Sequence, residues 1–353
     1  MKIALIELDD SPHDVNFYSQ VRFLKSVSNT HVTLICSDAL KERLGLYNNL
    51  VDNIQFVKKK LGIFDLLRLR KYLVNERFDK VIFNTAHGNQ IKILVSMPFP
   101  KYMEFIGISH YPDKFKTSNS QKLISRRVKK YFLLNDYLLQ DIGSNPGLKI
   151  STTYFIFYPE LAKIPLGKKN DEIWICIPGV VEFYRRDYES LLKEIERKGL
   201  NSKVKFILLG SSKHKNGAGT PLKEIISGLG LDDHFKLWDG FVGLEEFYSY
   251  IHESDFIMPL IHPSHESFGV YKNQISGAFN LAFGFKKMLL MEESFRQYDD
   301  FKNNSVFYDV ENILKTINSL ELPDKKNVYK EDKWSFDFQA NKYWELINSG
   351  AEA

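Results

Sequence analysis

The sequence predicts an α/β fold built from two doubly wound, Rossmann-like domains. Short apolar runs of strand length alternate with amphipathic segments of helix length, a pattern typical of βαβ units in a parallel sheet. The alternation stops at residues 164–171, which combine Pro, Gly and charged side chains, and then starts again. Because 353 residues exceed what one hydrophobic core usually serves, we expect one domain on each side of this segment.

The first expected domain covers residues 1–165. Its apolar runs predict strands at 2–7, 31–36, 53–57, 80–84, 101–108, 130–134 and 152–157. The segments between them predict helices at 16–27, 38–44, 63–75, 90–96, 118–127 and 137–142. Ligands bind beyond the carboxyl ends of the strands in such sheets. This rule predicts that ligands bind at three loops, 8–16, 85–89 and 109–115.

The second expected domain covers residues 166–330. Its apolar runs predict strands at 172–178, 204–210, 235–238, 256–260 and 287–291, and the segments between them predict helices at 186–198, 221–229, 244–251 and 271–284. The last part of the chain, 331–353, contains an aromatic and amphipathic segment at 334–347. We expect this segment to form a terminal helix that crosses back onto the first domain.

Composition indicates a globular cytoplasmic protein, with 44% hydrophobic and 26% charged residues. No window approaches 18 uncharged apolar residues, and residues 2–6 enter a strand at once, so we expect no membrane span and no signal peptide. The two cysteines, Cys36 and Cys176, lie in apolar runs of different halves. We expect both to be reduced core residues, as is usual in the cytoplasm.

Basic residues concentrate in two stretches of the first half. Residues 114–130 contain seven Lys or Arg and no acid, and residues 57–71 contain three consecutive lysines together with Arg68, Arg70 and Lys71. Two explanations stay open: solvated helix surfaces, or attraction to an anionic membrane or an anionic lipid-linked substrate. No recognition motif or aromatic platform accompanies the charge, so nucleic acid is not expected as a partner.

The segment 265–291 has the pattern of an anion-binding turn. It follows an apolar strand, begins with a polar turn that includes Glu266, and passes through Phe268 and Gly269 into an expected helix. The first N–H groups of a helix are unpaired and carry partial positive charge, which attracts anions. We therefore expect this turn to form part of a ligand site.

Four further motifs accompany that turn. They are residues 175–179 (ICIPG) followed by 185–188 (RRDY), 205–210 (KFILLG), 238–246 (WDGFVGLEE) and 255–260 (DFIMPL). Together with 266–269 (ESFG), these motifs resemble the GT-B glycosyltransferases, in particular the bacterial group 1, retaining-type transferases that use nucleotide-diphosphate sugars. The resemblance covers 170–291. It implies two Rossmann-like domains that face a cleft, with a C-terminal helix crossing back to the first.

The resemblance implies a donor site on the second domain. A leaving nucleotide diphosphate accumulates negative charge, which fixed cations and backbone N–H groups can stabilise without an essential metal or a cofactor. The expected sugar contact is Glu266. The second Glu of the family's Glu-x7-Glu motif is replaced here by Gln274, an uncharged amide that can still bind a ribose hydroxyl. The full set of expected donor contacts is Arg185, Arg186, Gly210, Lys213, Gly240, Ser267, Phe268, Gly269, Val270 and Gln274.

Histidines provide the candidates for proton transfer. His13 and His110 lie in loops that follow expected strands of the first domain, and members of the resembling family place histidines at such positions. We therefore list His110, His13 and Glu266 as catalytic candidates, although each histidine could equally be an incidental surface or capping residue. His262, His265 and Glu266 could form a metal site, but no further ligand lies at a typical spacing, so no metal is expected.

The function that this resemblance implies is transfer of a sugar from a nucleotide-diphosphate donor to a lipid-linked or polysaccharide acceptor in cell-surface glycan synthesis. The expected partners are the nucleotide sugar, the glycan or lipid-linked acceptor, and an anionic membrane in peripheral contact. Two alternatives stay open. The chain could be another GT-B enzyme, such as a nucleotide-sugar epimerase, or a non-catalytic two-domain protein that binds a sugar.

Overall fold

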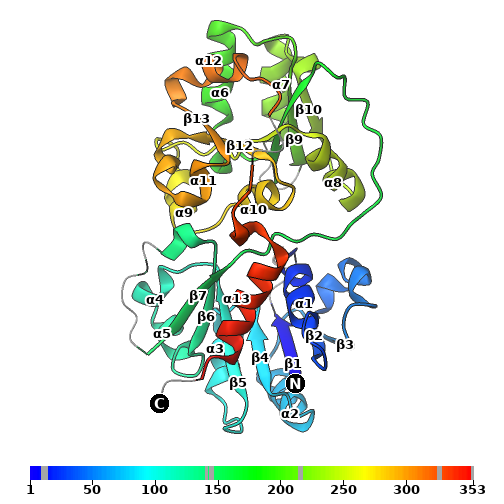
Figure 1. Cartoon of the computed structure of the whole chain (residues 1–353), viewed down its shortest axis with the longest axis vertical. Helices are drawn as coiled ribbons and strands as arrows, with labels where there is room; N and C mark the ends of the chain where they lie inside the picture. Colours follow the sequence, from blue (N-terminus) through cyan, green and yellow to red (C-terminus); the bar gives the residue numbers. More distant parts are fainter. Residues whose placement is uncertain (9–14, 140–141, 143–146, 214–217, 324–327, 351–353) are drawn as a thin grey trace. The chain divides into compact units, whose positions relative to one another are not determined.

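The computed structural model describes residues 1–8, 15–139, 142, 147–213, 218–323 and 328–350. The chain forms two compact units (Figure 1). Unit 1 comprises Met1–Tyr158 together with Asp332–Ala353, and unit 2 comprises Pro159–Glu331. Each unit contains one parallel sheet with helices on its faces. This confirms the predicted α/β fold of two Rossmann-like domains.

Unit 1 is organised around a seven-stranded parallel sheet in the order β3-β2-β1-β4-β5-β6-β7. The central strands are apolar on both faces because helices cover both sides of the sheet. The chain runs outward from β1 to β3 and then returns to β4 beside β1, so the connections reverse direction between these two strands. The strands are β1 (Lys2–Glu7), β2 (His31–Ser37), β3 (Asn53–Val57), β4 (Lys80–Phe83), β5 (Glu104–Ser109), β6 (Lys130–Leu134) and β7 (Lys149–Thr153).

The helices of unit 1 form two groups by their contacts. The first group is α1 (Phe17–Lys25) and α13 (Phe336–Asn348), which pack against each other. The second group is α2 (Ile63–Asn75), α3 (Asn89–Ser96) and α5 (Asn119–Ile124), in which α3 contacts both neighbours. The short helix α4 (Lys114–Thr117) precedes α5, and 3-10 turns occupy Asp38–Arg43, Gly45–Tyr47 and Asp136–Leu139.

The C-terminal helix belongs to unit 1, as predicted. Figure 1 shows α13 in red beside α1 in blue. The Tyr343 hydroxyl lies 3.0 Å from Gln20 Oε1, and Trp344 Nε1 donates to the Phe23 carbonyl at 2.7 Å. The Tyr343 ring is fully buried and stacks on Phe132 with 4.4 Å between centroids. A residue far along the chain thereby completes the core of the first unit.

This contact allows a prediction about stability. Tyr343→Phe keeps the stacked ring but leaves Gln20 Oε1 without this donor, so we expect the free energy of unfolding of unit 1 to fall by about 1–2 kcal/mol. Urea unfolding followed by circular dichroism measures the change. Tyr102→Phe is the matched control, because Tyr102 is 53% exposed and its change should stay within about 0.5 kcal/mol. If Tyr343→Phe and Tyr102→Phe were equally stable, the hydrogen bond between Tyr343 and Gln20 would not stabilise unit 1.

Unit 2 contains a six-stranded parallel sheet in the order β10-β9-β8-β11-β12-β13. The reversal of connections falls between β8 and β11. The strands are β8 (Ile173–Pro178), β9 (Val204–Ser211), β10 (Phe235–Trp238), β11 (Phe256–Ile257), β12 (Met288–Glu292) and β13 (Ser305–Tyr308). The helices are α6 (Tyr188–Lys198), α7 (Gly219–Gly228), α8 (Leu244–Glu253), α9 (Ser267–Lys272), α10 (Gly277–Gly284), α11 (Asp299–Lys302) and α12 (Ile313–Asn318). Buried side chains of β8, β9, α6, α7 and α12 form one apolar cluster.

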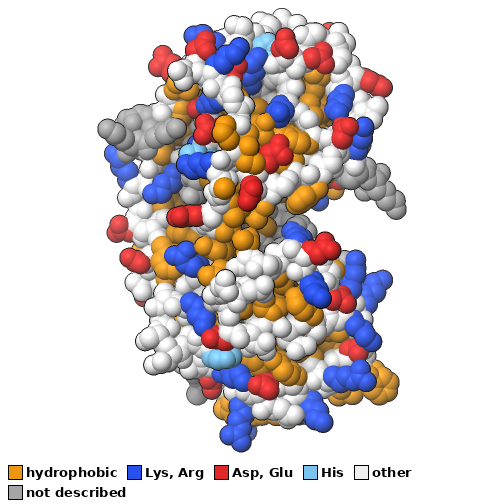
Figure 2. Space-filling view, turned by 90° about the vertical axis from the view of Figure 1, so that its right-hand side faces the viewer, with side chains coloured by type: hydrophobic (Ala, Val, Ile, Leu, Met, Phe, Trp, Pro, Cys, Tyr) orange, Lys and Arg blue, Asp and Glu red, His pale blue; other side chains and the backbone are white. Residues whose placement is uncertain are grey.

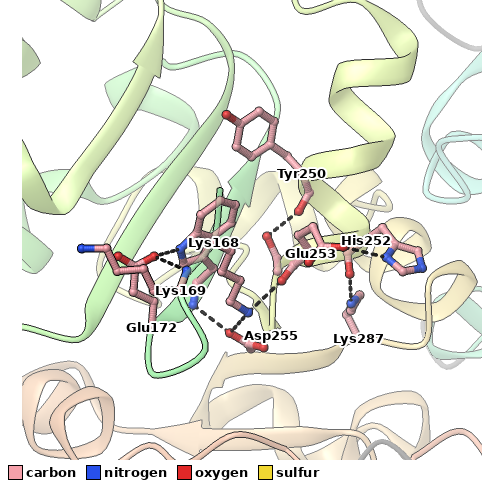
Figure 3. Close-up of polar contacts among 10 residues, drawn as sticks. Lys168, Lys169, Glu172, Tyr250, His252, Glu253, Asp255 and Lys287 are labelled. Atoms are coloured by element: carbon pink, nitrogen blue, oxygen red, sulfur yellow. Dashed lines mark hydrogen bonds and ion pairs between the residues drawn. The ribbon is translucent and has the colours of Figure 1, made fainter. Parts of the chain in front are cut away.

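The segment before β8 is bonded to the amino ends of the strands of unit 2 (Figure 3). Lys168 Nζ lies 2.6 Å from Asp255 Oδ2 and donates to the Glu253 carbonyl at 2.9 Å. The same carboxylate oxygen accepts the Trp174 N–H at 2.8 Å. Asp255 is 4% exposed, so its charge is desolvated and requires these partners. This polar cluster therefore anchors the entry into the sheet, at the opposite end of the strands from their carboxyl ends.

Several expectations about local structure were wrong or incomplete. The strand predicted at 152–157 is β7, Lys149–Thr153, and the strand predicted at 256–260 is only Phe256–Ile257. The single helix predicted at 271–284 is two helices, α9 and α10, and residues 273–276 separate them. The helix predicted from 186 begins at Tyr188, because Asp187 caps it by accepting the Ser190 N–H. Strand β13 and helix α12 follow the last predicted strand and were missed, because the four residues of β13 are too few to show a clear period.

The described residues include no helix that is both long enough and apolar enough to cross a membrane.

Candidate functional site

The best-supported site in unit 2 lies where the connections of its sheet reverse direction, at the carboxyl ends of β8 and β11. In open parallel sheets this position leaves a crevice between loops that diverge to opposite faces, and ligands bind there. Here the diverging loops are residues 179–187 after β8 and 258–266 after β11. The Asp187 N–H donates to the Leu260 carbonyl at 3.2 Å and joins the two loops.

A close backbone approach shapes this edge of the sheet. Gly179 has a φ of 106°, a conformation that favours glycine. Its carbonyl oxygen would lie only 2.1 Å from a Cβ placed on Gly210, which is at the end of β9. A side chain at Gly210 therefore cannot be accommodated without movement of the 179–180 turn. Gly210 was predicted as a donor contact, and the structure gives it a steric role in positioning this turn.

Arg186 is a buried cation at this edge. It is 5% exposed, and its guanidinium donates to the carbonyl oxygens of Pro178 at 3.2 Å and Arg185 at 2.9 Å and to the Tyr271 hydroxyl at 3.3 Å. No carboxylate among the described residues pairs with it, and its Nε has no hydrogen-bond partner within that part of the chain. Buried charges in proteins are normally paired or bind a ligand. The site therefore has positive charge available for an anion.

Arg185 differs from its neighbour. Its side chain is 48% exposed, its Nε lies 2.6 Å from Glu182 Oε2, and the same nitrogen donates to the Tyr184 hydroxyl at 3.0 Å. Because Glu182 already balances its charge, Arg185 is the weaker candidate for binding an anion. The structure brings both predicted arginines to one turn but gives them different electrostatic environments.

Three hydrogen-bonded side chains, Asp187, His262 and Tyr308, connect the two loops to β13. His262 is fully buried, and its Nδ1 lies 2.7 Å from Asp187 Oδ2 while its Nε2 lies 3.0 Å from the Tyr308 hydroxyl. Burial opposes ionisation of Asp187, but hydrogen bonds from His262 and Ser190 outweigh it and lower its pKa to about 2. Burial raises the pKa of Tyr308 well above its usual value. Asp187 is thus an anion and Tyr308 a neutral hydrogen-bonding group at neutral pH.

The low pKa of Asp187 leads to a prediction about acid stability. A carboxylate whose pKa is depressed by folding stabilises the native state above its unfolded pKa, and this contribution is lost as the pH falls from about 4 towards 2. We expect Asp187→Asn to remove about 1–2 kcal/mol of this pH-dependent stability. Urea unfolding of both proteins across that pH range measures it. Parallel stability curves for the two proteins would contradict the role given to Asp187.

The predicted acidic turn lies beside this edge. Glu266 is exposed and immediately precedes α9, and Val270 is 50% exposed on the same short helix. Ser267 is buried, and its hydroxyl lies 2.7 Å from His265 Nδ1. Phe268 packs edge-to-face on Phe295, with ring centroids 5.8 Å apart.

The other predicted contacts of this turn are Gly269 and Gln274. Gly269 is exposed, with open space where a Cβ would lie, and Gln274 is partly buried in the segment between α9 and α10. Tyr271 of α9 reaches Arg186, so this turn and the arginine belong to one site.

Lys213 and Gly240 lie at the carboxyl ends of β9 and β10. Lys213 Nζ lies 2.7 Å from Asp239 Oδ2, and Lys223 contacts the other oxygen of the same carboxylate. Hydrogen bonds from Lys213 and Lys223 lower the pKa of Asp239 to about 2. Since β10 is the edge strand, two strands away from β8, the structure does not bring this pair together with Arg186.

The histidines considered as metal ligands have other partners. His262 contacts Asp187 and Tyr308, and His265 contacts Ser267. Within the described ranges, no group of three or more His, Cys, Asp or Glu side chains is placed to hold a metal ion.

Unit 1 has a cavity at the corresponding edge, between the carboxyl ends of β1 and β4. Its volume is about 260 Å³. Glu7 at the end of β1 is buried and accepts hydrogen bonds from Asn84 Nδ2 at 2.7 Å and Thr85 Oγ1 at 2.6 Å. The lining residues are Glu7, Leu8, Lys59, Lys60, Thr85, His87, Gly88, Asn89, Gln90 and Ile91. The cavity therefore combines a carboxylate, hydroxyl and amide groups, and two lysines.

His110 follows β5, which pairs with β4, and it is not among the residues that line the cavity. It is buried, and its Nε2 lies 2.8 Å from the Asn84 carbonyl oxygen. A carbonyl can only accept, so this bond fixes the ring with a proton on Nε2. His13, the other histidine candidate, lies outside the described residues.

Sequence reasoning missed several polar residues of both sites. They are Glu7, Asn84 and Thr85 in unit 1, and Glu182, Asp187, Tyr271 and Tyr308 in unit 2, while His262 was considered only as a metal ligand. One signal was present, since Glu7, Asn84 and Thr85 are polar residues that interrupt apolar runs at strand ends. The pairings could not be predicted from local patterns because they join residues far apart in the chain, 77 positions for Glu7 and Asn84 and 85 positions for Arg186 and Tyr271.

No protein-family model matches the chain, and no curated protein matches it. Solved structures do resemble it. A glycosyltransferase from Rickettsia africae is 12% identical with a TM-score of 0.65, and the match covers 99% of both chains. Anabaena HepE in complex with UDP-glucose is 13% identical with a TM-score of 0.64, covering 98% of this chain and 95% of that one.

The UDP-GlcNAc 2-epimerase from Methanocaldococcus jannaschii is also similar, with 13% identity, a TM-score of 0.62, and coverage of 99% of this chain and 100% of that one. These similarities extend over nearly the whole length of each chain, in both units. They show that the chain has the GT-B fold, with two Rossmann-like units and a C-terminal helix that returns to the first.

Proposed function

We propose that this protein is a glycosyltransferase that transfers a sugar from a nucleotide-diphosphate sugar to an acceptor held by unit 1. The observation that carries the proposal is Arg186, a buried guanidinium without a carboxylate partner among the described residues, at the edge where parallel sheets bind ligands. A diphosphate has the charge and the oxygen spacing that a guanidinium fork binds well. Structures with the same fold include enzymes with UDP-glucose and with UDP-GlcNAc bound, which supports a nucleotide sugar as the ligand.

The donor would be bound through the loops that contain Arg186 and Glu266. Arg186 would stabilise the negative charge that develops on the diphosphate as the glycosidic bond breaks, with a smaller contribution from Arg185. Glu266, exposed at the start of α9, would accept hydrogen bonds from sugar hydroxyls. Gln274 would bind a ribose hydroxyl through its amide. The donor is the only small molecule that this scheme requires besides the acceptor.

The acceptor would be bound at the cavity of unit 1. Glu7 and Thr85 provide groups that bind hydroxyls, and Lys59 and Lys60 provide positive charge suited to a phosphate or a carboxylate. His110 is proposed as the group that receives a proton from the attacking hydroxyl, because Nδ1 is the basic nitrogen when Nε2–H donates to the Asn84 carbonyl. These features favour a lipid-linked or polysaccharide acceptor.

A nucleotide-sugar epimerase is the second candidate, because UDP-GlcNAc 2-epimerases are among the similar structures. The two reactions differ in a measurable way. An epimerase changes the sugar of the nucleotide sugar without any acceptor, whereas a transferase releases free nucleotide in proportion to the glycosylated acceptor that forms.

The first experiment is a thermal-shift screen of the full chain with UDP, GDP, CMP and ADP. A nucleotide present at 100 times its Kd stabilises the protein by about 2.7 kcal/mol, which corresponds to a rise in Tm of about 5–10 °C for the unit that binds it. The nucleotide sugar of the responding base is then incubated with and without a cell-derived lipid fraction, and its products are separated by chromatography. No response to any of the four nucleotides would contradict the proposal, and turnover without acceptor would favour the epimerase.

A further inference from the structure

The first turns of α2 expose apolar side chains. Ile63 is 51% exposed, Phe64 75% and Leu67 45%. These residues are one, three and four positions apart, so a helix places them on one face. The opposite face, with Leu66, Leu69 and Leu73, packs into unit 1. The apolar residues on the outer face therefore do not belong to the core of the unit.

Basic side chains surround these apolar residues. Lys58, Lys59 and Lys60 precede α2, and Arg68 and Lys71 follow Phe64 and Leu67 at helical spacing. The side chains of Lys58 and Arg68 are 72% and 80% exposed. We call this set the α2 face, and it consists of Lys58, Lys59, Lys60, Ile63, Phe64, Leu67, Arg68 and Lys71.

Residues 57–71 contain one acidic side chain, Asp65. Its carboxylate accepts the Gly62 N–H at 3.2 Å and so caps the start of the helix. It also lies 3.6 Å from Arg68 Nη1 and 3.8 Å from Lys58 Nζ, but such exposed pairs are weak and do not cancel the charge of the cluster. The α2 face therefore keeps a strong excess of positive charge.

The neighbouring helices also expose apolar side chains, in one case beside a basic residue. Helix α3, which packs against α2, exposes Ile93, and α5, which packs against α3, exposes Leu123 next to Lys122. In the lower part of Figure 2, hydrophobic side chains reach the surface beside Lys and Arg side chains. Apolar side chains that project between cations match the layering of a membrane surface, where acyl chains lie beneath anionic headgroups.

We propose that the α2 face docks unit 1 onto a bilayer that contains anionic lipids. Ile63, Phe64 and Leu67 insert into the boundary between headgroups and acyl chains, and the surrounding lysines and arginines bind lipid phosphates. Charge complementarity favours this partner over a second copy of the chain, because two α2 faces would bring like charges together. Lys59 and Lys60 of the α2 face also line the cavity of unit 1, so the variants that test the proposal leave them unaltered and change only residues of helix α2, which belong to neither candidate site.

The test is co-sedimentation of the full chain with vesicles. One set of vesicles is pure phosphatidylcholine, and the other is an equimolar mixture of phosphatidylcholine and phosphatidylglycerol. We expect binding to the anionic vesicles that weakens at high salt, because the charge contribution is screened. Phe64→Ser with Leu67→Ser should weaken binding by at least roughly tenfold, since the inserted side chains are lost. Arg68→Gln with Lys71→Gln should weaken it by about fivefold for each charge at low salt.

Matched controls come from exposed residues of unit 2. Ile225→Ser removes an apolar side chain that is 41% exposed, and Lys193→Gln removes an exposed cation of α6. We expect both controls to bind vesicles as the unaltered protein does. Unchanged Tm values show that the α2 variants remain folded. Absence of binding to anionic vesicles would overturn the proposal, as would equal binding by the α2 variants and the unaltered protein. A nucleotide response in the thermal-shift screen is independent of either result.

Discussion

Gly210→Ala is expected to destabilise unit 2 and to abolish measurable nucleotide binding. The added Cβ would lie 2.1 Å from the Gly179 carbonyl oxygen and 2.5 Å from the Gly179 carbonyl carbon. Both are backbone atoms, so no side-chain rotation relieves the contact, and the 179–180 turn must move. We expect a loss of about 3 kcal/mol in the free energy of unfolding, at the upper end for an overpacked site. Urea unfolding and thermal-shift titration measure the two effects.

Gly228→Ala is the matched control for this substitution. Gly228 ends α7, and a Cβ there meets no atom within 4 Å, so alanine should be neutral or slightly stabilising. If Gly210→Ala behaves like Gly228→Ala in both measurements, the close approach of the two turns does not exist in solution.

Arg186→Leu is expected to weaken nucleotide binding by roughly 10- to 100-fold, the usual range for losing hydrogen bonds to a charged group. Leucine occupies part of the same buried space but cannot bind an anion. Isothermal titration with the nucleotide identified by the thermal-shift screen measures the change. A urea unfolding curve accompanies it, because Arg186 also bonds to the Pro178 carbonyl and to Tyr271.

Two related variants separate charge from packing. Arg186→Lys keeps the charge but loses the planar fork, so we expect an intermediate affinity. Arg185→Leu removes the neighbouring cation, which Glu182 already pairs, and should cost less than roughly tenfold. If Arg185→Leu and Arg186→Leu weakened nucleotide binding equally, the absence of a carboxylate partner for Arg186 would not be what determines binding. An unchanged affinity for Arg186→Leu would remove the main support for the proposed donor site.

Much of the fold was predictable because its signals are local. The strands of both sheets are short runs of Val, Ile, Leu and Phe separated by amphipathic helices, and α2 was predicted with its observed bounds, Ile63–Asn75. The return of the terminal helix to unit 1 was predicted from the aromatic and amphipathic pattern of 334–347, and the helix is observed at Phe336–Asn348. The break between α9 and α10 was not predicted, although residues 273–277 (NQISG) contain Asn, Ser and Gly, residue types that are common between helices.

The candidate site was less accessible to such reasoning. Arg185 and Arg186 are adjacent in the sequence and chemically identical, yet Arg185 is half-exposed and pairs with Glu182, whereas Arg186 is buried and has no such partner among the described residues. No local pattern distinguishes them, because the difference arises from Tyr271 and Pro178, which the sheet brings to the same edge. Gly210 was selected from a motif, whereas its steric role depends on the carbonyl of Gly179 in another loop.

The sequence by itself determined the two-part α/β architecture, the basic stretches and the residue types available at the strand ends. These properties follow from periodicity and composition, which act over a few residues. Only the tertiary structure decided which of those residues meet: Glu7 with Asn84, Asp187 with His262, and Arg186 with Tyr271. The reason is that burial and the pairing of charges depend on strand order, which joins residues distant in the chain and leaves no local trace in the sequence.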